Sequence, residues 1–251
     1  MKQFSHLKNE PSEIYAAVLA HADARIGQLL ATLDRLEVAD NTLVIFSSDN
    51  GPEKTGPPSH RHTDDESTGP GFGTFASVGT TGGHRGGKRS LLQGGIGVPF
   101  IARWPGRIAA GKIDDTTPIT AVDLLPTFCA LGGATLPEDY TPDGVDQSAA
   151  LFGKPSSARS KPIFWQWKSA SSRGANWPAY AVRTGGWKLL LGKNPKQLEL
   201  FRFPHDRLEK QNLQASEAVE VKRLKAVLNG WKKTLPAQPN ADCLSSERGK
   251  N

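Results

Sequence analysis

The N-terminal part of the chain alternates apolar and charged residues with a helical period. Between Ser12 and Glu37, apolar residues recur at steps of three and four, with charged residues between them. The apolar positions are Tyr15, Val18, Leu19, Ala22, Ile26, Leu29, Leu30, Leu33 and Leu36. This pattern predicts a long amphipathic helix.

Two short, continuous apolar runs come later and have the length of strands. The first is Thr42–Phe46 and the second is Val98–Arg103. Continuous apolar runs are typical of strands that are covered on both faces. Residues 104–106 then predict a turn, and Thr120–Leu131 predicts a short helix. Together these elements predict an α/β layer.

The connection between the two apolar runs is long and has no apolar periodicity. Half of the chain's 26 glycines lie within residues 51–97. Connections of this kind are usually either functional or disordered. His60 and His62 lie beside acidic residues 64–66, which would suit a second metal site, but the composition equally fits a solvated insertion.

The composition changes after Gly153, where residues 154–157 have the composition of a linker. Aromatic-rich short strands begin at Ile163, and the Thr184-Gly185-Gly186 turn predicts a hairpin between residues 180–183 and 187–190. A final helix is expected over Ser216–Lys233. Its expected buried stripe consists of Val219, Leu224, Val227, Leu228 and Trp231.

The composition of the 251 residues is that of a globular protein, with 37% hydrophobic and 22% charged residues. A net charge of +6 favours anionic partners such as sulfated sugars, nucleic acid or anionic lipid, or simply aids solubility. Because Lys and Arg are dispersed among acidic residues, nucleic acid is not expected. No segment has the apolar length of a membrane span or a signal peptide core, so no membrane partner is expected.

Two clusters carry candidate chemistry, and the first is at the end of the first apolar run. Asp49 and Asn50 both offer oxygen, the ligand that calcium and magnesium prefer. Loops beyond strand ends form the ligand crevice of open α/β sheets. The same residues, followed by Gly51 and Pro52, also fit an ordinary turn after a strand.

The second cluster is a basic, glycine-rich segment, residues 85–90, followed by Gly94 and Gly95. Glycines let backbone N–H groups approach an anion, and Lys88 supplies a positive charge. His84 precedes this loop and could donate a proton to an anion or to a leaving oxygen, with a simple loop histidine as the alternative. The spacing differs from that of the nucleotide phosphate loop, and a solvated basic turn is the other interpretation.

The order of these motifs resembles that of the sulfatase family. Sulfatases have a strand ending in Ser-Asp-Asn-Gly, a long variable loop, and then Gly-Gly-Lys and Gly-Gly-Ile-Arg-Val-Pro. This chain has Ser48–Gly51, Arg85–Leu91 and Gly94–Pro99 in that order. Further segments that look like family landmarks are Trp104–Gly106, Asp123–Thr127, Asp143–Val145, Ala181–Leu189 and Leu198–Leu213. The resemblance covers nearly the whole chain.

The resemblance implies roles for the candidate residues. Asp49 and Asn50 would be two ligands of a calcium-type cation that holds the sulfate, and Lys88 would contact a sulfate oxygen. Cations in these positions would stabilise negative charge on the transferring group. The family has Arg where this chain has Gly97, so the interaction made by that Arg is lost or supplied elsewhere.

The sulfatase nucleophile has no counterpart in this sequence. It is a Cys, or a Ser in its place, in Cys-x-Pro-Ser-Arg that is oxidised to formylglycine, whose hydrate attacks sulfur. The chain's two cysteines, Cys129 and Cys243, match neither this motif nor a zinc or disulfide spacing. We therefore expect this chain to be the C-terminal portion of a sulfatase, without the N-terminal half that carries the formylglycine and further acidic metal ligands. Alone, such a portion would be inactive.

The resemblance also implies the fold and the domains. We expect residues 1–153 to form the later part of an alkaline-phosphatase-like α/β sandwich, the catalytic domain. Residues 154–235 would form a small antiparallel sheet with a C-terminal helix, and residues 236–251 a flexible tail.

The function implied is that of an arylsulfatase-like sulfuric-ester hydrolase, with sulfated amino sugars as candidate substrates. Two alternatives remain open: a non-catalytic module that binds sulfated polysaccharides through the basic loop and the C-terminal sheet, and a related phosphoester or phosphonate hydrolase. For the binding module, Lys188, Lys193 and Lys196 beside Trp187 would form a basic and aromatic surface for sulfated sugar. The alternation of these residues also fits a hairpin with one solvent-exposed face. Family resemblance implies a periplasmic, extracellular or lysosomal location, and the sequence indicates no oligomeric state.

Overall fold

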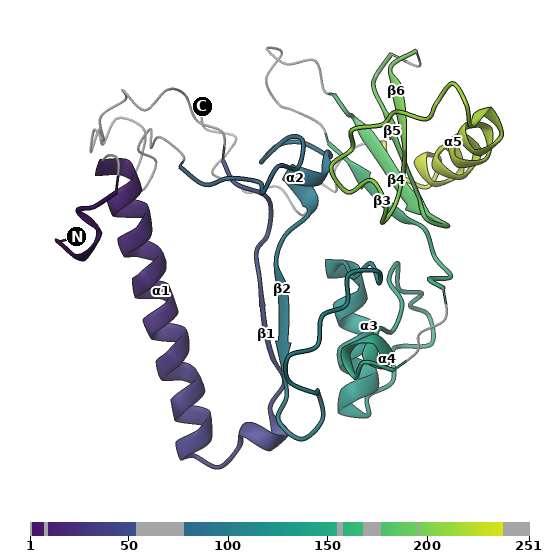
Figure 1. The fold of residues 1–251 in the computed structure, drawn as a ribbon. Helices are drawn as coiled ribbons and strands as arrows, with labels where there is room; N and C mark the ends of the chain where they lie inside the picture. The colour runs from purple at the N-terminus through teal and green to yellow at the C-terminus, as the bar shows by residue number, and fades with distance from the viewer. Residues whose placement is uncertain are drawn as a thin grey trace, which may run out of the picture.

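The computed structural model describes residues 2–7, 10–53, 78–154, 158–167, 177–194 and 196–237. Within them, a long helix, a two-stranded ribbon, a small helical unit and a four-stranded sheet with its own helix follow one another (Figure 1). His60, His62, the neighbouring acidic residues 64–66 and Cys243 lie outside the described residues, as does the expected tail from residue 238 onward. None of the described helices has the length and apolar character that a membrane crossing requires.

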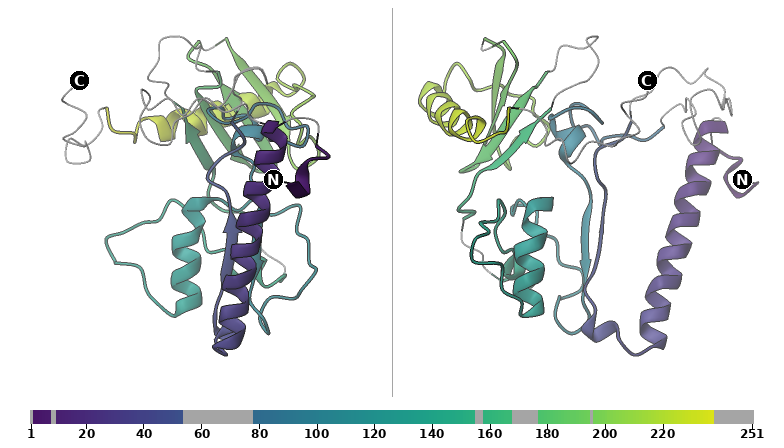
Figure 2. Two further views of the ribbon diagram at one scale, coloured as in Figure 1. Left: turned by 90° about the vertical axis from the view of Figure 1, so that its left-hand side faces the viewer. Right: turned by 180° about the vertical axis from the view of Figure 1, so that it is seen from behind.

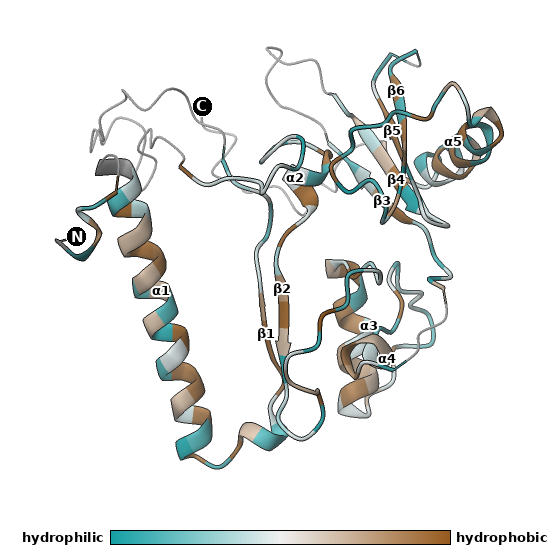
Figure 3. Cartoon of the chain, viewed as in Figure 1, coloured by the Kyte–Doolittle hydropathy of each residue, from teal (hydrophilic) through white to brown (hydrophobic). Residues whose placement is uncertain are grey.

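The predicted amphipathic helix is confirmed as α1, Glu10–Arg35, preceded by the short helix η1, Lys2–Phe4. Figure 2 shows α1 standing apart from both sheets, and Figure 3 shows apolar residues along its length. Val18 is 61% exposed and Leu36 is 56% exposed. Arg103 and Asp34, 3.3 Å apart, link this helix to strand β2. The apolar face of α1 is therefore largely uncovered in this part of the chain.

The two apolar runs form an antiparallel ribbon of β1, Val44–Ser47, and β2, Phe100–Arg103, after the short helix η2, Ala39–Asn41. The expectation that both strands are covered on both faces was wrong. Phe46 is 46% exposed and Ile101 is 60% exposed. Among the described residues, no helix or further strand packs extensively on the ribbon. Its apolar residues therefore form an exposed surface that is suited to packing but has no partner in this part of the chain.

A small helical unit follows the ribbon and confirms the helix predicted over Thr120–Leu131. It contains η4, Ala121–Asp123, α3, Leu124–Gly132, and α4, Ser148–Leu151. Fully buried Asp123 accepts hydrogen bonds from the backbone N–H groups of Thr120 and Val145 and pairs with Arg159 at 2.7 Å. A Cβ at Gly144 would lie 2.0 Å from the carbonyl oxygen of Val122, so only glycine permits this approach. The segments 123–127 and 143–145 thus form one packed unit.

The predicted small sheet and C-terminal helix are both present. Four antiparallel strands run in the order β3-β4-β5-β6. Their bounds are Ile163–Gln166, Tyr180–Thr184, Trp187–Leu191 and Leu198–Arg202. Gly185 and Gly186 have φ values of 58° and 75°, the left-handed pair that a two-residue hairpin turn requires. The expected boundary near residue 154 stays a prediction.

The sheet is covered on both faces. Helix α5, Ala218–Lys232, packs on one face against Val182, Leu189 and Leu200. The other face, with Leu190 and Phe201, packs on Leu91, Leu92 and Ile96 of the glycine-rich segment. These two sets alternate along the strands, as the period of two requires. The glycine-rich segment is therefore built onto the sheet, opposite α5.

Two details of this packing correct the sequence interpretation. Lys188 of β5 is fully buried, so the hairpin has no wet face there and Lys188 belongs to no surface. Within α5, Val219 is 80% exposed and therefore does not belong to the buried stripe. Val221 packs against the core instead, together with Leu224 and Leu228.

Candidate functional site

The turn after β1 places Asp49 and Asn50 outside strand geometry. The Asn50 backbone N–H donates to Asp49 Oδ1 at 2.9 Å, and Ser48 Oγ donates to the Asn50 carbonyl at 3.1 Å. The Asn50 side-chain N–H donates to the Gly51 carbonyl at 2.9 Å. These local bonds fix the turn and leave Asp49 Oδ2 and Asn50 Oδ1 without a hydrogen-bond partner among the described residues.

Glycines bring this turn into direct contact with the basic loop. The Gly51 N–H donates to the Gly95 carbonyl at 2.9 Å, and the Gly94 N–H donates to the Arg85 carbonyl at 2.6 Å. A Cβ at Gly51 would lie 1.8 Å from Gly94 O, and a Cβ at Gly94 would lie 3.0 Å from His84 O. Three backbone segments therefore touch here, and the structure brings together the two motifs singled out in the sequence.

Lys88 is held beside the turn by its own backbone. Its N–H donates to the Pro52 carbonyl at 2.9 Å, and its Nζ lies 3.7 Å from Glu53 Oε2. Arg89, whose φ is 67°, also binds Glu53, at 2.5 Å. The Lys88 side chain remains 41% exposed, so its ammonium can reach a ligand. Sequence reasoning missed Glu53; its position four residues after Asp49 was the available signal.

His84 lies at the start of the same loop and is half-buried. Its Nδ1 is 2.7 Å from the Thr81 carbonyl oxygen, which can only accept, so Nδ1 carries a proton. Nε2 has no hydrogen-bond partner among the described residues. The Thr81 hydroxyl donates to the His84 carbonyl at 2.6 Å and fixes the backbone as well. The ring is thus oriented, with one nitrogen free to exchange a proton.

The ligand atoms at Asp49 and Asn50 are of the chemical type that a hard divalent cation prefers. Asp49 Oδ2 and Asn50 Oδ1 have no hydrogen-bond partner in the described parts of the chain, and oxygen is the ligand such cations prefer. They are too few, since calcium takes about six to eight oxygens. No group of three or more acidic, histidine or cysteine side chains in the described residues could complete the shell. If a cation binds here, substrate, water or another segment would supply the remaining ligands.

A buried ion pair fixes the basic loop to the C-terminal sheet. Glu209, with φ of 54°, accepts from Lys188 Nζ at 2.6 Å and from the Gln93 N–H at 2.9 Å. Both members of the pair are fully buried. Burial lowers the pKa of Lys188 to about 8, although the charge of Glu209 opposes this shift. Glu209 is therefore the partner that favours the charged form of the buried Lys188.

Arg85 makes a second link between the loop and the sheet. It binds Glu199 of β6 at 2.8 Å and donates to the Glu209 carbonyl at 3.1 Å. The hydrogen bond to Glu199 raises the pKa of Arg85, against the effect of burial. Neither Glu199 nor Glu209 was identified as a partner of Arg85 from the sequence, because each lies more than one hundred positions away from it.

Gly97 explains how the chain accommodates its departure from the family pattern. A Cβ at Gly97 would lie 2.4 Å from Gln93 Nε2 and 2.8 Å from the Gln93 carbonyl. Gln93 begins helix α2, Gln93–Ile96, whose first N–H is held by Glu209. The Gln93 side chain thus occupies the space beside Gly97, and a larger residue there would require it to move.

Gly51→Ala tests the contact between the two motifs. We expect it to lower the free energy of unfolding by about 1–3 kcal/mol, because its Cβ meets backbone rather than a movable side chain. Chemical denaturation measures this change. Gly27→Ala, within α1 and with nothing within 4 Å, is the control and should stabilise by about 0.5–1 kcal/mol. Equal effects of the two substitutions would refute the contact.

Two family models match the chain. The model described as Sulfatase matches residues 5–134, and the model described as N-sulphoglucosamine sulphohydrolase, C-terminal, matches residues 83–234. Each covers more than half of the sequence. The chain therefore belongs to the sulfatase family, and the mixed fold described above is part of the alkaline-phosphatase-like architecture.

Curated relatives and solved structures agree. Human arylsulfatase A is 37% identical over 170 residues, which are 68% of this chain and 29% of the relative. The N-acetylgalactosamine-6-O-sulfatase of Bacteroides thetaiotaomicron is 30% identical over 226 residues, 86% of this chain and 41% of the relative. The structure of Ps i-CgsB in complex with k-i-k-neocarrahexaose superposes with a TM-score of 0.72 at 27% identity, covering 92% of this chain and 45% of that one. The chain spans less than half the length of these relatives.

Proposed function

We propose that the protein is a metal-dependent sulfuric-ester hydrolase acting on sulfated sugars, and that this chain carries part of its metal and sulfate site. Membership in the sulfatase family supports the reaction class. The sugar substrate is supported by the relative named N-acetylgalactosamine-6-O-sulfatase and by the neighbour solved with an oligosaccharide. We propose that calcium is the cation, because the free donors are oxygen atoms.

The observation that carries the proposal is the glycine contact between the turn and the basic loop. The hydrogen bond from Gly51 to Gly95 and the bond from Lys88 to Pro52 hold the two motifs together. Neither motif could act alone, since the turn offers anionic and amide oxygens for a metal ion and the basic loop offers the ammonium group of Lys88. Their contact creates a place where a cation and an ammonium can face one sulfate group.

Each residue would then have a defined task. Asp49 and Asn50 would hold the cation, which supplies positive charge to the sulfate oxygens. Lys88 would leave Glu53 and contact a sulfate oxygen, so that its charge opposes the negative charge developing on the transferring group. With Nδ1–H bonded to Thr81, a His84 ring that is also protonated at Nε2 would donate the Nε2 proton to the ester oxygen that departs.

The test begins with the encoding locus. Sequencing upstream of Met1 should find an in-frame Cys-x-Pro-Ser-Arg or Ser-x-Pro-Ser-Arg together with acidic residues. The complete product should hydrolyse an aryl sulfate faster than the matching aryl phosphate, should lose this activity in EDTA, and should regain it with calcium. Saturable binding of sulfated sugar without hydrolysis would instead identify a binding module, and a preference for phosphate would identify a phosphoester hydrolase.

A further inference from the structure

A second concentration of positive charge lies on the opposite side of the C-terminal sheet from the basic loop. It lines a cavity of about 350 Å³ between the ends of β4 and β5 and the helix α5. The lining residues are Tyr180, Leu191, Gly192, Lys193, Lys225, Asn229 and Lys232. We refer to this cavity as the α5 pocket. No role in the proposed hydrolysis involves it.

The sheet separates the α5 pocket from the candidate active site. Tyr180 and Leu191 are paired across β4 and β5 and pack with the core under α5. The basic loop packs on the other face, through Leu91 and Leu92. A ligand in the α5 pocket is therefore separated from Lys88 by a full layer of the structure.

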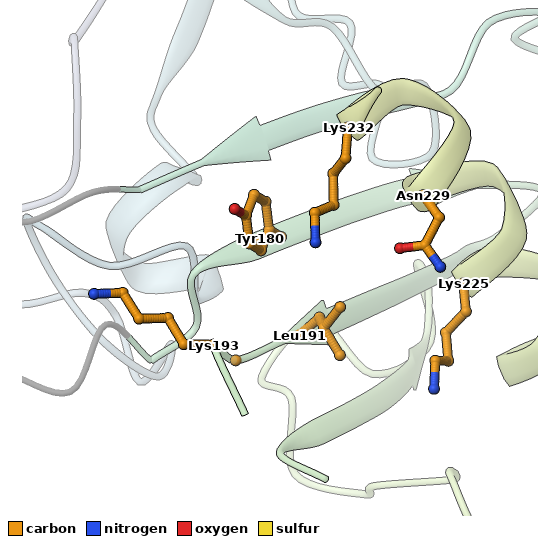
Figure 4. Close-up of a pocket in the computed structure, with 7 residues that line it drawn as sticks. Tyr180, Leu191, Lys193, Lys225, Asn229 and Lys232 are labelled. Carbon is orange, nitrogen blue, oxygen red and sulfur yellow. The ribbon is translucent and has the colours of Figure 1, made fainter. Parts of the chain in front are cut away.

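The pocket's charges come from one face of α5. Lys225, Asn229 and Lys232 are four and three residues apart, which places them on the same side of the helix. Figure 4 shows the Lys232 side chain extending toward Tyr180, whereas Lys225 extends away from Tyr180, with Asn229 between the two lysines. Lys193 extends away from the other two lysines. The pocket is thus lined along α5 by two ammonium groups with one amide between them.

These ammonium groups have no anionic partner within the described part of the chain. None of the ion pairs found there involves Lys225 or Lys232. Lys232 Nζ lies 4.2 Å from the centre of the Tyr180 ring, which holds it in place but does not neutralise it. Both lysines are half-buried, so their solvation is reduced. One ammonium held over Tyr180 and a second on the same face of α5, both without an anionic partner among the described residues and with the Asn229 amide between them, suit an oxyanion ligand.

We infer that the α5 pocket binds a sulfate group of a sulfated saccharide, as a second site that holds a polymer while another of its sulfates is in the active site. The choice of a sulfated saccharide rests on the proposed function; the anion specificity rests on the pocket itself. The pocket is small and concave, with an apolar floor at Leu191, and so suits a sugar ring with one anionic substituent. A nucleic acid would require a continuous basic face instead.

The direct test is calorimetric titration of the 251-residue chain with a chondroitin sulfate hexasaccharide. We expect saturable binding, and about tenfold weaker binding for each of Lys225→Gln and Lys232→Gln, because each substitution removes a positively charged hydrogen-bond donor. Lys193→Gln should change affinity less than Lys225→Gln does. Asn229→Asp places a negative charge between the two lysines and should also weaken binding about tenfold, because the charge repels the anion.

The matched control is the double variant Lys112→Gln/Lys210→Gln, which removes two exposed charges that do not line the α5 pocket. It should bind within about twofold of the parent, since distant charges are screened at physiological salt. Equal losses in this control and in Lys225→Gln/Lys232→Gln would overturn the inference, as would equal affinity for the desulfated hexasaccharide or for an RNA of similar length. Thermal unfolding should be alike in the two double variants.

Failure of this inference and failure of the proposed function are distinguishable. In the complete enzyme, Lys225→Gln/Lys232→Gln should raise KM for a sulfated polymer but leave kcat/KM for a small aryl sulfate unchanged. A protein that binds the hexasaccharide through α5 without hydrolysing any ester would preserve the pocket and refute the hydrolase. If the double variant hydrolyses the polymer with an unaltered KM, the hydrolase stands and the α5 pocket is refuted as a polymer-binding site.

Discussion

Lys88→Gln is expected to lower kcat for sulfate-ester hydrolysis about 10²–10³-fold in the complete enzyme, a loss typical of removing one preorganised stabiliser of developing charge. The Lys88 backbone is fixed by Pro52, so its ammonium is delivered to the turn that carries Asp49. Gln keeps much of the chain length and removes the charge. Steady-state kinetics should show the loss mainly in kcat, with a smaller change in KM.

Arg89→Gln is the matched control for this prediction. Arg89 is the next residue, carries the same charge and pairs with the same carboxylate, Glu53, but its side chain is 60% exposed. If Lys88 acts at the sulfate, Arg89→Gln should retain activity within about threefold, because an exposed ion pair contributes about 0–1 kcal/mol. Equal losses in the two variants would show that the local charge, and not the position of Lys88, matters.

Glu209→Ala is expected to lower the free energy of unfolding by about 3–5 kcal/mol, because it leaves the buried ammonium of Lys188 without its partner. It also removes the acceptor for the Gln93 N–H. Equilibrium denaturation of the 251-residue chain measures the change. As a control, Glu220→Ala breaks only an exposed pair with Arg223 and should cost about 0–1 kcal/mol.

A double variant separates charge from packing at this position. Lys188→Met/Glu209→Gln removes both charges and keeps a side-chain oxygen for Gln93, so it should be more stable than Glu209→Ala. If the double variant is as unstable as the single one, the cost comes from lost packing or from the left-handed backbone at Glu209, and the uncompensated charge is not the cause.

Local sequence patterns predicted where helices and strands form better than they predicted which segments cover them. The helical period from Ser12 to Glu37 and the Gly185-Gly186 turn both gave correct elements, because each depends on neighbouring residues only. The run Thr42–Phe46 gave a strand whose burial was misjudged. An apolar run shows that a surface is suited to packing, but not which segment covers it.

The candidate site shows the same division. Asp49, Asn50 and Lys88 were identified from motif order, and the glycines that join them were visible in the sequence. Their contact could not be derived, since it depends on backbone atoms of Gly51 and Gly94 meeting at close range. Lys188 was interpreted as a surface residue because a lysine is hydrophilic, and its partner, Glu209, comes after another strand and a turn.

The attachment of the basic loop to the sheet has a consequence for heat inactivation. Glu209, in the segment that follows the sheet, binds the Gln93 N–H. Glu199, in β6, binds Arg85. The geometry of Lys88 therefore depends on a distant layer staying folded. Activity should be lost at the temperature where hydrogen exchange in β5 and β6 accelerates, whereas fraying of α1 at lower temperature should leave the basic loop in place.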